Sequence, residues 1–213
     1  MQLFKSLIIL LFLIISFSAQ GQNDGNINQF GLKAGINSSK YTPSTVLTDY
    51  NNHIGFYAGV FYELRLDERF SFKPELLFSL QGSSITHKDI QINNGNLPFY
   101  VEPYDFDFEV YDYVVAIPLT IKYHLIKDLY LGAGPQFNFI IDQTFQTDQQ
   151  LLDGTGFGRI YEDGENFEFG FHLVLGYDIS NTISFQVGAF SAVGNRNNDA
   201  KSFVLNSGLE FKL

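Results

Sequence analysis

Eight stretches of the chain alternate between apolar and polar residues with a period of two. Successive side chains of a strand point to opposite faces, so this period predicts strands with one apolar and one polar face. In residues 54–66, for example, the apolar set is Ile54, Phe56, Ala58, Val60, Tyr62, Leu64 and Leu66. The predicted strands cover residues 30–39, 54–66, 70–81, 113–125, 129–141, 166–178, 182–191 and 202–213.

The segments between these strands alternate in length. Residues 67–69, 126–128 and 179–181 are predicted tight turns, whereas residues 40–53, 82–112, 142–165 and 192–201 are predicted long loops. Short turns at one end and long loops at the other are typical of an up-and-down barrel in an outer membrane. We expect the short turns and both ends of the barrel chain on the periplasmic side.

The positions of the glycines decide which face of the strands points into the barrel. A lipocalin-like soluble barrel also alternates, but it turns its apolar face inward. Here ten glycines share the face that carries the charged residues: Gly31, Gly35, Gly55, Gly59, Gly132, Gly134, Gly170, Gly176, Gly188 and Gly208. The interior of an eight-stranded barrel is only wide enough for side chains to fill, so this face points inward and the aromatic face meets lipid. The sequence therefore predicts an all-β fold, an eight-stranded antiparallel up-and-down transmembrane β-barrel.

The inward face is expected to carry a balanced set of charges. Its five cations and five anions are Lys33, Glu63, Arg65, Lys73, Glu75, Lys122, Glu168, Asp178, Glu210 and Lys212. Buried charges are costly unless they are paired, so we expect ion pairs across a filled lumen. An ion path through the lumen is the alternative. Three strand prolines, Pro74, Pro118 and Pro135, each lack a backbone donor, and we expect local bulges there.

The N-terminus predicts a cleaved signal peptide. Lys5 precedes an unbroken apolar run over residues 7–15, and small residues surround Ala19-Gln20-Gly21. The apolar run is short for a membrane-spanning helix, which needs about 20 residues, so an uncleaved anchor is the weaker interpretation. We therefore divide the chain into a signal peptide, residues 1–21, and an outer-membrane β-barrel domain, residues 22–213.

Composition and charge exclude several classes of protein. The chain has no Cys, so it has no disulfide, no thiolate metal site and no lipid anchor on an N-terminal Cys. Its net charge of −10 argues against nucleic acid, because phosphate binding needs clustered Lys and Arg. The two longest predicted loops, residues 82–112 and 142–165, each carry a net charge of −5 and account for this excess.

Nothing in the sequence indicates catalysis. His53 and His87 fall in predicted loops, while His124 and His172 face inward on predicted strands. Glu168 and His172 lie roughly 13 Å apart along one strand, which is too far for a hydrogen bond. There is no Gly-x-Ser-x-Gly or His-Glu-x-x-His motif. We predict no enzyme activity, no catalytic residues, no cofactor-binding residues, no metal site and no cofactor.

The acidic loops are the candidates for recognition. They are expected to form a solvated surface, bridged to lipopolysaccharide by divalent ions, or to bind a protein partner. Direct calcium binding is an alternative, although the loop at Asp153 lacks the acidic spacing of an EF-hand. Residues 104–110 alternate strictly and are predicted to extend the fourth strand above the membrane, with a break of phase near Asp112. Their apolar face either packs against the barrel or recruits a partner.

Two segments carry a family resemblance. Residues 30–38 read FGLKAGINS, and residues 116–139 read AIPLTIKYHLIKDLYLGAGPQFNF. The motif residues are Gly31, Lys33, Gly35 and Asn37 in the first segment, and Ile117, Pro118, Leu119, Ile121, Lys122, Tyr123, Gly132, Gly134 and Pro135 in the second. The chain resembles the PorT-type outer-membrane β-barrel family of Bacteroidetes. The resemblance implies a barrel at the outer membrane without catalytic residues, and some members of that family take part in protein secretion.

The leading hypothesis is a monomeric, non-enzymatic outer-membrane barrel with a filled lumen, whose extracellular loops have structural or binding roles. Its expected partners are outer-membrane lipid and lipopolysaccharide, with a protein partner at the acidic loops as a further option. An amphipathic last strand that ends at Leu213 agrees with this destination. The second hypothesis is an accessory component of a secretion or surface-assembly machine. An outer-membrane hydrolase that uses His124 and His172 is the third.

Overall fold

The computed structural model describes residues 28–90, 104–147, 160–161, 166–194 and 200–213. The predicted signal peptide and most of the predicted loop 142–165 lie outside these residues. The strands are β1 (Gln29–Thr42), β2 (Thr48–Arg65), β3 (Phe70–Ile90), β4 (Tyr104–Ile126), β5 (Leu129–Gln146), β6 (Ile160–Tyr161), β7 (Phe167–Asp178), β8 (Ile183–Ala192) and β9 (Lys201–Lys212). In this part of the chain, no helix is long and apolar enough to cross a bilayer.

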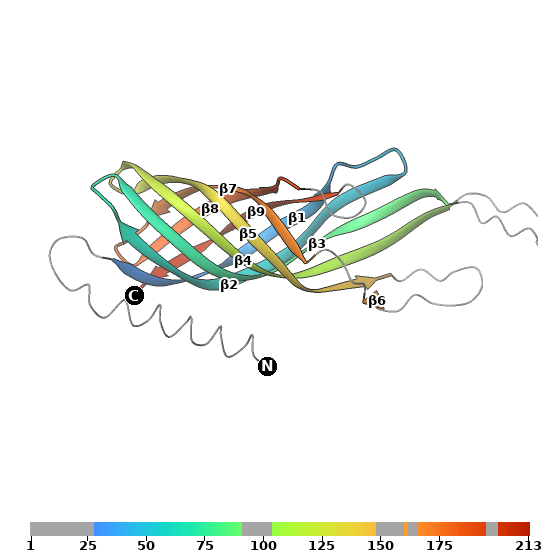
Figure 1. Cartoon of the computed structure of the whole chain (residues 1–213), viewed down its shortest axis with the longest axis horizontal. Helices are drawn as coiled ribbons and strands as arrows, with labels where there is room; N and C mark the ends of the chain where they lie inside the picture. Colours follow the sequence, from blue (N-terminus) through green and yellow to red (C-terminus); the bar gives the residue numbers. More distant parts are fainter. Residues whose placement is uncertain (1–27, 91–103, 148–159, 162–165, 195–199) are drawn as a thin grey trace, which may run out of the picture.

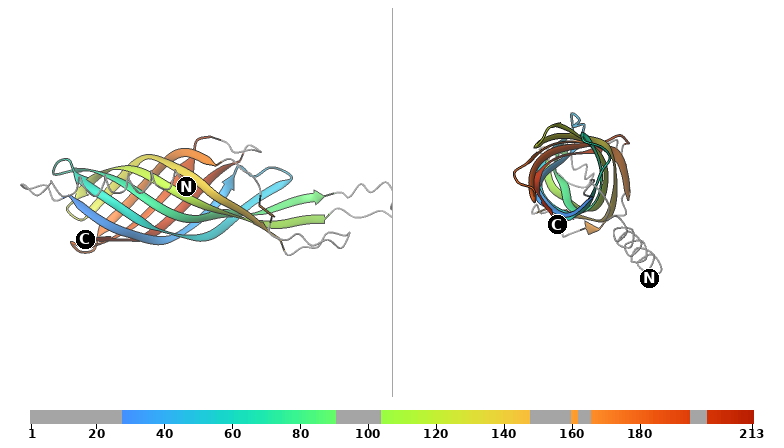
Figure 2. Two further views of the ribbon diagram at one scale, coloured as in Figure 1. Left: turned by 60° about the horizontal axis from the view of Figure 1, so that its bottom comes forward. Right: turned by 90° about the vertical axis from the view of Figure 1, so that its left-hand side faces the viewer.

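Eight of these strands form a closed antiparallel ring, as the sequence predicts. Each ring strand pairs with its neighbour in the chain, and β1 closes the ring by pairing with β9, with Gly35 opposite Gly208. The short β6 pairs only with β5, at Thr144 and Phe145. The end-on view in Figure 2 shows the ring, and Figure 1 shows the tilted strands from the side.

Large apolar side chains are exposed on the outer face of all eight ring strands. They include Leu32, Ile36, Ile54, Phe56, Phe70, Phe78, Ile121, Leu131, Phe139, Phe171, Leu173, Phe185, Val187, Leu205 and Leu209. The glycine and charged face points inward, as predicted. We call the band of outward apolar residues the apolar belt. A belt of this kind around a closed ring is the surface that a lipid bilayer accommodates.

The short connections lie together at one end, which we call the short-turn end. Asp67 forms the β2–β3 turn, because its Oδ1 accepts the backbone N–H groups of Arg69 (2.7 Å) and Phe70 (2.8 Å). These two donors hold the pKa of the Asp67 carboxyl below its usual range. The β4–β5 and β7–β8 connections are similarly tight, so the three predicted turns are confirmed.

The predicted loops 40–53 and 82–112 are largely wrong, because both are mostly strand. β1 and β2 leave only residues 43–47 between them, and β3 and β4 continue as a long ladder in which Ile85 pairs with Phe108. This ladder projects beyond the rest of the ring (Figure 1). We call residues 48–53, 83–90, 104–112 and 142–146 the extension, and the end of the barrel that carries it the hairpin end.

The extension reverses the polarity of the strands. On β4, Phe106, Phe108 and Val110 turn inward while Asp107 and Glu109 are exposed outside, the opposite of the arrangement beside the apolar belt. The alternation of side chains does not slip near Asp112, so the predicted break of phase is a change of polarity. Inward apolar residues are expected where a strand leaves lipid for water. The predicted continuation of the fourth strand over residues 104–110 is confirmed, whereas the upper parts of β2 and β3 were missed because the sequence analysis assumed one polarity for them throughout.

The prolines do not cause the predicted bulges. Pro74 pairs with Leu119, and three residues later Leu77 pairs with Ala116 in the same register. The ladders of Pro118 and Pro135 likewise keep their register, and the register shifts fall elsewhere, for example between Tyr113 and Val114. A lost ladder bond is therefore absorbed locally without an extra residue.

Candidate functional site

The centre of the lumen holds a ring of four alternating charges. Lys33 on β1 contacts Glu75 on β3 (2.5 Å), and Glu75 also contacts Lys73 (3.0 Å). Lys73 pairs with Glu210 on β9, and Glu210 lies 3.9 Å from Lys33, which closes the ring. All four side chains are at most 6% exposed. We call these residues the charge tetrad.

One amide completes the hydrogen bonding of the tetrad. Gln186 on β8 lies between Lys33 and Glu210 and is fully buried. With its amide oriented to match these partners, its oxygen accepts from Lys33 Nζ (2.5 Å) and its nitrogen donates to Glu210 Oε1 (2.9 Å). Buried charges need such extra bonds in addition to their mutual attraction. The tetrad therefore links β1, β3, β8 and β9 across the interior.

Further ion pairs lie toward the short-turn end. Lys122 on β4 pairs with Glu63 on β2 (2.7 Å), and Lys212 on β9 pairs with Asp178 on β7 (2.9 Å). Glu168, nearer the hairpin end, accepts a hydrogen bond from the Ser202 hydroxyl (2.9 Å). The predicted pairing across the lumen is thus confirmed for eight of the ten charges, namely Lys33, Glu63, Lys73, Glu75, Lys122, Asp178, Glu210 and Lys212. Arg65 differs from the prediction, because it is exposed and donates to the carbonyls of the β2–β3 turn.

Inward aromatic rings lie beside the strand glycines, a feature that the sequence analysis missed. A Cβ added to Gly31 would lie 2.2 Å from the Phe61 ring, and one added to Gly176 would lie 2.0 Å from the Tyr130 ring. Both glycines pair directly with these aromatic residues across a ladder. The glycines therefore provide the space that the large rings occupy beside the wall.

The rings also contact the buried cations. Lys122 Nζ lies 3.7 Å from the centre of the Tyr130 ring, and Lys73 Nζ lies 5.3 Å from that of Phe61. An ammonium group over an aromatic face is stabilised by the quadrupole of the ring. The aromatic, glycine and charged residues thus form one packed plug in the short-turn half of the lumen.

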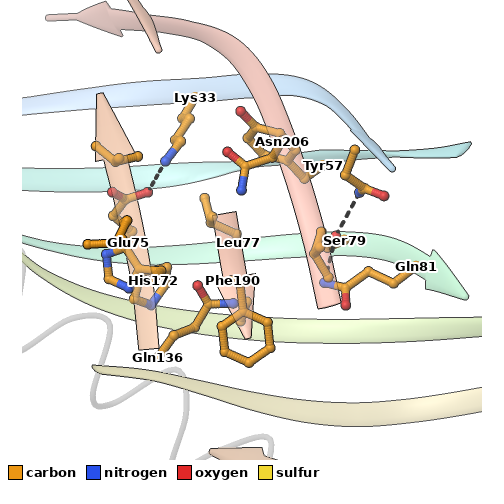
Figure 3. A pocket seen from close by; sticks show the side chains of 16 residues that line it. Lys33, Tyr57, Glu75, Leu77, Ser79, Gln81, Gln136, His172, Phe190 and Asn206 are labelled. Atoms are coloured by element: carbon orange, nitrogen blue, oxygen red, sulfur yellow. Dashed lines mark hydrogen bonds and ion pairs between the residues drawn. The ribbon is translucent and has the colours of Figure 1, made fainter. Parts of the chain in front are cut away.

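A cavity of about 40 Å³ lies in the middle of the barrel, between the tetrad and the hairpin end. Residues of all eight ring strands line it, and Lys33, Glu75, His172, Gln136, Ser79 and Asn206 are among its polar groups. Figure 3 shows the Lys33–Glu75 pair at one end of this group and Ser79 and Gln81 toward the other. Each water molecule in a protein cavity needs roughly 10–15 Å³ of such space, so the cavity suits a few waters and excludes a larger solute.

The hairpin end is closed by a hydrogen-bonded cluster and an apolar cluster. The Tyr41 hydroxyl on β1 donates to Asp112 Oδ2 on β4 (2.7 Å), and Gln143 on β5 donates to Asp112 Oδ1 (2.6 Å). Asp112, which the sequence analysis placed in an acidic loop, therefore lies inside the barrel. Tyr41, Ile85, Val110 and Ala200 form the apolar cluster, against which Tyr50, Phe108 and Phe145 pack.

The four histidines are separate from one another. His53 and His87 lie on β2 and β3, so their assignment to loops is wrong; the His53 ring contacts Tyr111, and His87 Nδ1 bonds to Thr48 (2.9 Å). His124 and His172 face inward as predicted, where they bond to Ser71 (3.3 Å) and Thr120 (2.8 Å). Within the described ranges, no three acidic or histidine side chains are grouped to hold a metal ion.

The outer face of the extension is polar and acidic. Thr86 donates to Asp107 (2.7 Å), the Tyr111 hydroxyl donates to Glu109, and Lys88 pairs with Asp49 (2.6 Å) at side chains that are 40% exposed. The Thr86–Asp107 and Lys88–Asp49 contacts join neighbouring strands, while Tyr111 and Glu109 both lie on β4. Together they hold the side chains in place. The extension therefore presents an ordered polar surface outside the apolar belt.

Comparisons with known proteins agree with this architecture. The model of the family described as outer membrane protein beta-barrel domain matches residues 19–195. A search of curated proteins finds no significant relative. Among solved structures, Neisserial surface protein A shares 12% identity and a TM-score of 0.50, with 86% of this chain and 97% of that chain covered.

Two further structures have lower scores. Ail, the attachment invasion locus protein of Yersinia pestis, shares 11% identity with a TM-score of 0.48, with 87% of this chain and 99% of that chain covered. The outer membrane protease OmpT of Escherichia coli shares 12% identity with a TM-score of 0.39, with 90% and 99% covered. At such identities the likeness concerns the fold alone. The family match spans most of the chain, and the protein therefore belongs to the outer membrane protein beta-barrel domain family and resides in the outer membrane.

Proposed function

We propose that the protein is a non-enzymatic barrel with a closed lumen that anchors the extension in the outer membrane and presents it to the outside of the cell. The observation that carries this proposal is the reversal of polarity along β4. Its lower part has the apolar outside that lipid requires, whereas its upper part has the acidic outside that water requires. A strand built in this way supports a surface that stands clear of the membrane.

The orientation follows from the lengths of the connections. Outer-membrane barrels have short periplasmic turns and longer extracellular segments. The short-turn end is therefore periplasmic, and the acidic face of the extension, with Asp107 and Glu109, is extracellular. Its contacts are lipopolysaccharide, through bridging divalent ions, and a protein partner at the same face. The closed ring leaves no strand edge that could pair with a second copy, which supports a monomer.

The closed lumen argues against transport of solutes. The tetrad joins opposite parts of the wall, and Tyr41, Asp112 and Gln143 join the wall again at the hairpin end. His124 and His172 bond to the hydroxyls of Ser71 and Thr120. Both hydroxyls are buried, at 1% and 0% exposure, so neither is open to a substrate as a nucleophile would need to be. These contacts support a lumen whose side chains stabilise the barrel, and the functional surface is the extension.

The extension can be shortened with a defined change. Residues 86–107 are replaced by Asn-Gly, so that Ile85 and Phe108, which are paired in the ladder, flank a two-residue turn. We expect the shortened protein to insert normally. A photoreactive residue at position 49, on β2, is present in both proteins; it should crosslink to surface material in intact cells in the full-length protein and lose these crosslinks in the shortened one. The full-length protein with the same photoreactive residue is the matched control. Unchanged crosslinking at position 49 after shortening would show that the hairpin is not the contact surface.

The closed lumen has its own test. The purified protein in planar bilayers is expected to give no steady ion current above that of the lipid alone. A reproducible conductance would refute the closed lumen and would favour the ion path, while leaving the role of the extension open.

The second candidate function is an accessory role in a secretion or surface-assembly machine. It is favoured by the PorT-type motifs, which include Gly31, Lys33, Gly35 and Asn37 on β1, and Ile117, Lys122 and Tyr123 on β4. Co-purification of a stoichiometric partner in mild detergent, lost on shortening the extension, would favour this role. Isolation of a lone monomer under the same conditions would argue for the first.

A further inference from the structure

The cavity in the middle of the lumen has polar walls with unmet hydrogen-bonding capacity. Asn37 donates through Nδ2 to the Ser79 hydroxyl (3.1 Å) and to the Leu80 carbonyl (3.0 Å), but no described residue donates to its Oδ1. His172 uses Nε2 to bond to Thr120, and no described residue bonds to its Nδ1. Asn37 and His172 are 2% and 6% exposed, so bulk solvent does not satisfy these atoms.

Both side chains belong to the wall of this cavity, together with Ser79, Gln81 and Gln136. A buried polar atom without a partner costs free energy, and proteins usually satisfy such an atom with an internal water molecule. A space that holds water needs room for the molecule and two to four polar partners. The volume of about 40 Å³ and these side chains meet both conditions.

We propose that the cavity is a binding site for a small cluster of water molecules that bond to Asn37 Oδ1 and His172 Nδ1 and extend to the side of the Lys33–Glu75 pair that faces the cavity. The cavity accommodates about three molecules, because each needs ~10–15 Å³ of its volume. The cluster solvates the tetrad on its side toward the hairpin end, where the Phe61 and Tyr130 rings do not reach. This inference goes beyond the proposed function, because a barrel with or without a surface partner would hold the cluster.

Two other contents of the cavity are less consistent with the contacts. A dry void would leave Asn37 and His172 unsatisfied, whereas empty protein cavities are lined by apolar residues. A bound ion would need an unbalanced charge, but Lys33 and Glu75 already pair with each other at 2.5 Å. Neutral water, which both donates and accepts, matches a mixed wall of amides, hydroxyls and an imidazole.

A substitution that fills the cavity tests the proposal through the sign of its effect. Ala116 lies on the wall and is 2% exposed, so Ala116→Val places two methyl groups toward the space. Displacing water that satisfies Asn37 and His172 lowers stability, whereas filling a dry void raises it. We expect the midpoint of urea unfolding in lipid vesicles to fall. The control Ala133→Val makes the same change on β5 at an exposed, outward position.

A direct measurement on the unmodified protein decides the question if the valine variant does not fold. Crystals that diffract well enough to show ordered water are pressurised with xenon, which enters dry apolar cavities. We expect water density within hydrogen-bonding distance of Asn37 Oδ1 and His172 Nδ1, and no xenon. Xenon in the cavity, an anomalous signal there after a bromide soak, or a higher unfolding midpoint for Ala116→Val would each overturn the proposal.

Discussion

At the scale of single residues, the charge tetrad is balanced, and removing one member leaves an unpaired buried charge. We expect Lys73→Met to destabilise the barrel by about 3–5 kcal/mol. The double variant Lys73→Met/Glu210→Gln should lose less than Lys73→Met alone, because it leaves the neutral pair Lys33 and Glu75. Urea unfolding in lipid vesicles measures both. The control is Lys88→Met, which breaks an exposed pair with Asp49 and should cost less than about 1 kcal/mol. Equal losses for the Lys73 and Lys88 variants would contradict the buried tetrad.

The glycines that face inward are required by the rings beside them. In Gly176→Ala, the new methyl group would lie 2.0 Å from the buried Tyr130 ring, so the ring or the backbone must move. We expect a loss of roughly 1–3 kcal/mol in the same assay, in the range that overpacking usually costs. Gly194→Ala is the control, since nothing lies within 4 Å of its added Cβ. The loss should shrink in a Tyr130→Ala background, and a loss of unchanged size there would exclude the ring as its cause.

At the scale of strands, the polarity reversal predicts which parts of the chain are on the outside. The chain has no native Cys, so single cysteines report their position without interference. In intact cells, Asp107→Cys should react with a membrane-impermeant maleimide, whereas Asp128→Cys in the β4–β5 turn should react only after the outer membrane is opened. Reaction of both positions in intact cells would mean that the cells leak, and the reverse pattern would invert the proposed orientation.

The extension also depends on its own small core. Phe108 packs on the cluster that contains Ile85 and Val110, so Phe108→Ala should loosen the β3–β4 ladder above the apolar belt. Hydrogen exchange is expected to speed up for residues 83–88 and 105–111, with no change in β7–β9. Phe139→Ala, on the lipid-facing side of β5, is the control. Uniformly faster exchange would show that the extension and the ring unfold as one unit.

At the scale of the whole molecule, the sequence predicted the ring and the continuation of β4 over residues 104–110, and it missed the neighbouring upper parts of β2 and β3 for one physical reason. A fixed two-residue period with lipid on one side identifies every ring strand, because glycine and charge share the inner face, as at Gly31 and Lys33. The rule that the apolar face points outward fails at Phe106 and Phe108, because water replaces lipid there and the apolar side turns inward.

The inward charges were identified correctly, but their partners depend on which strands face one another across the lumen. The tilt of the strands and the closure of the ring between β1 and β9 determine which strands face one another. No local sequence pattern encodes these two features. The contacts of Phe61 and Tyr130 with glycines had a local signal in the sequence, namely aromatic residues on the face that carries the glycines.

Because the ring is closed, we expect the position of a deletion in the chain to affect barrel formation more than the number of residues deleted. Removing β9, residues 201–213, would leave the edges of β1 and β8 unpaired in lipid, where no water can satisfy their backbone groups. We expect this variant to lose heat-modifiable migration on a gel, because no closed barrel forms. Replacing residues 86–107 with Asn-Gly removes more of the chain but cuts no ring strand within the apolar belt, so its unboiled and boiled forms should still migrate differently. Heat-modifiable migration of the β9 deletion would mean that the remaining seven strands close on their own. Its loss in the shortened hairpin would mean that the extension is needed to form the ring beneath it.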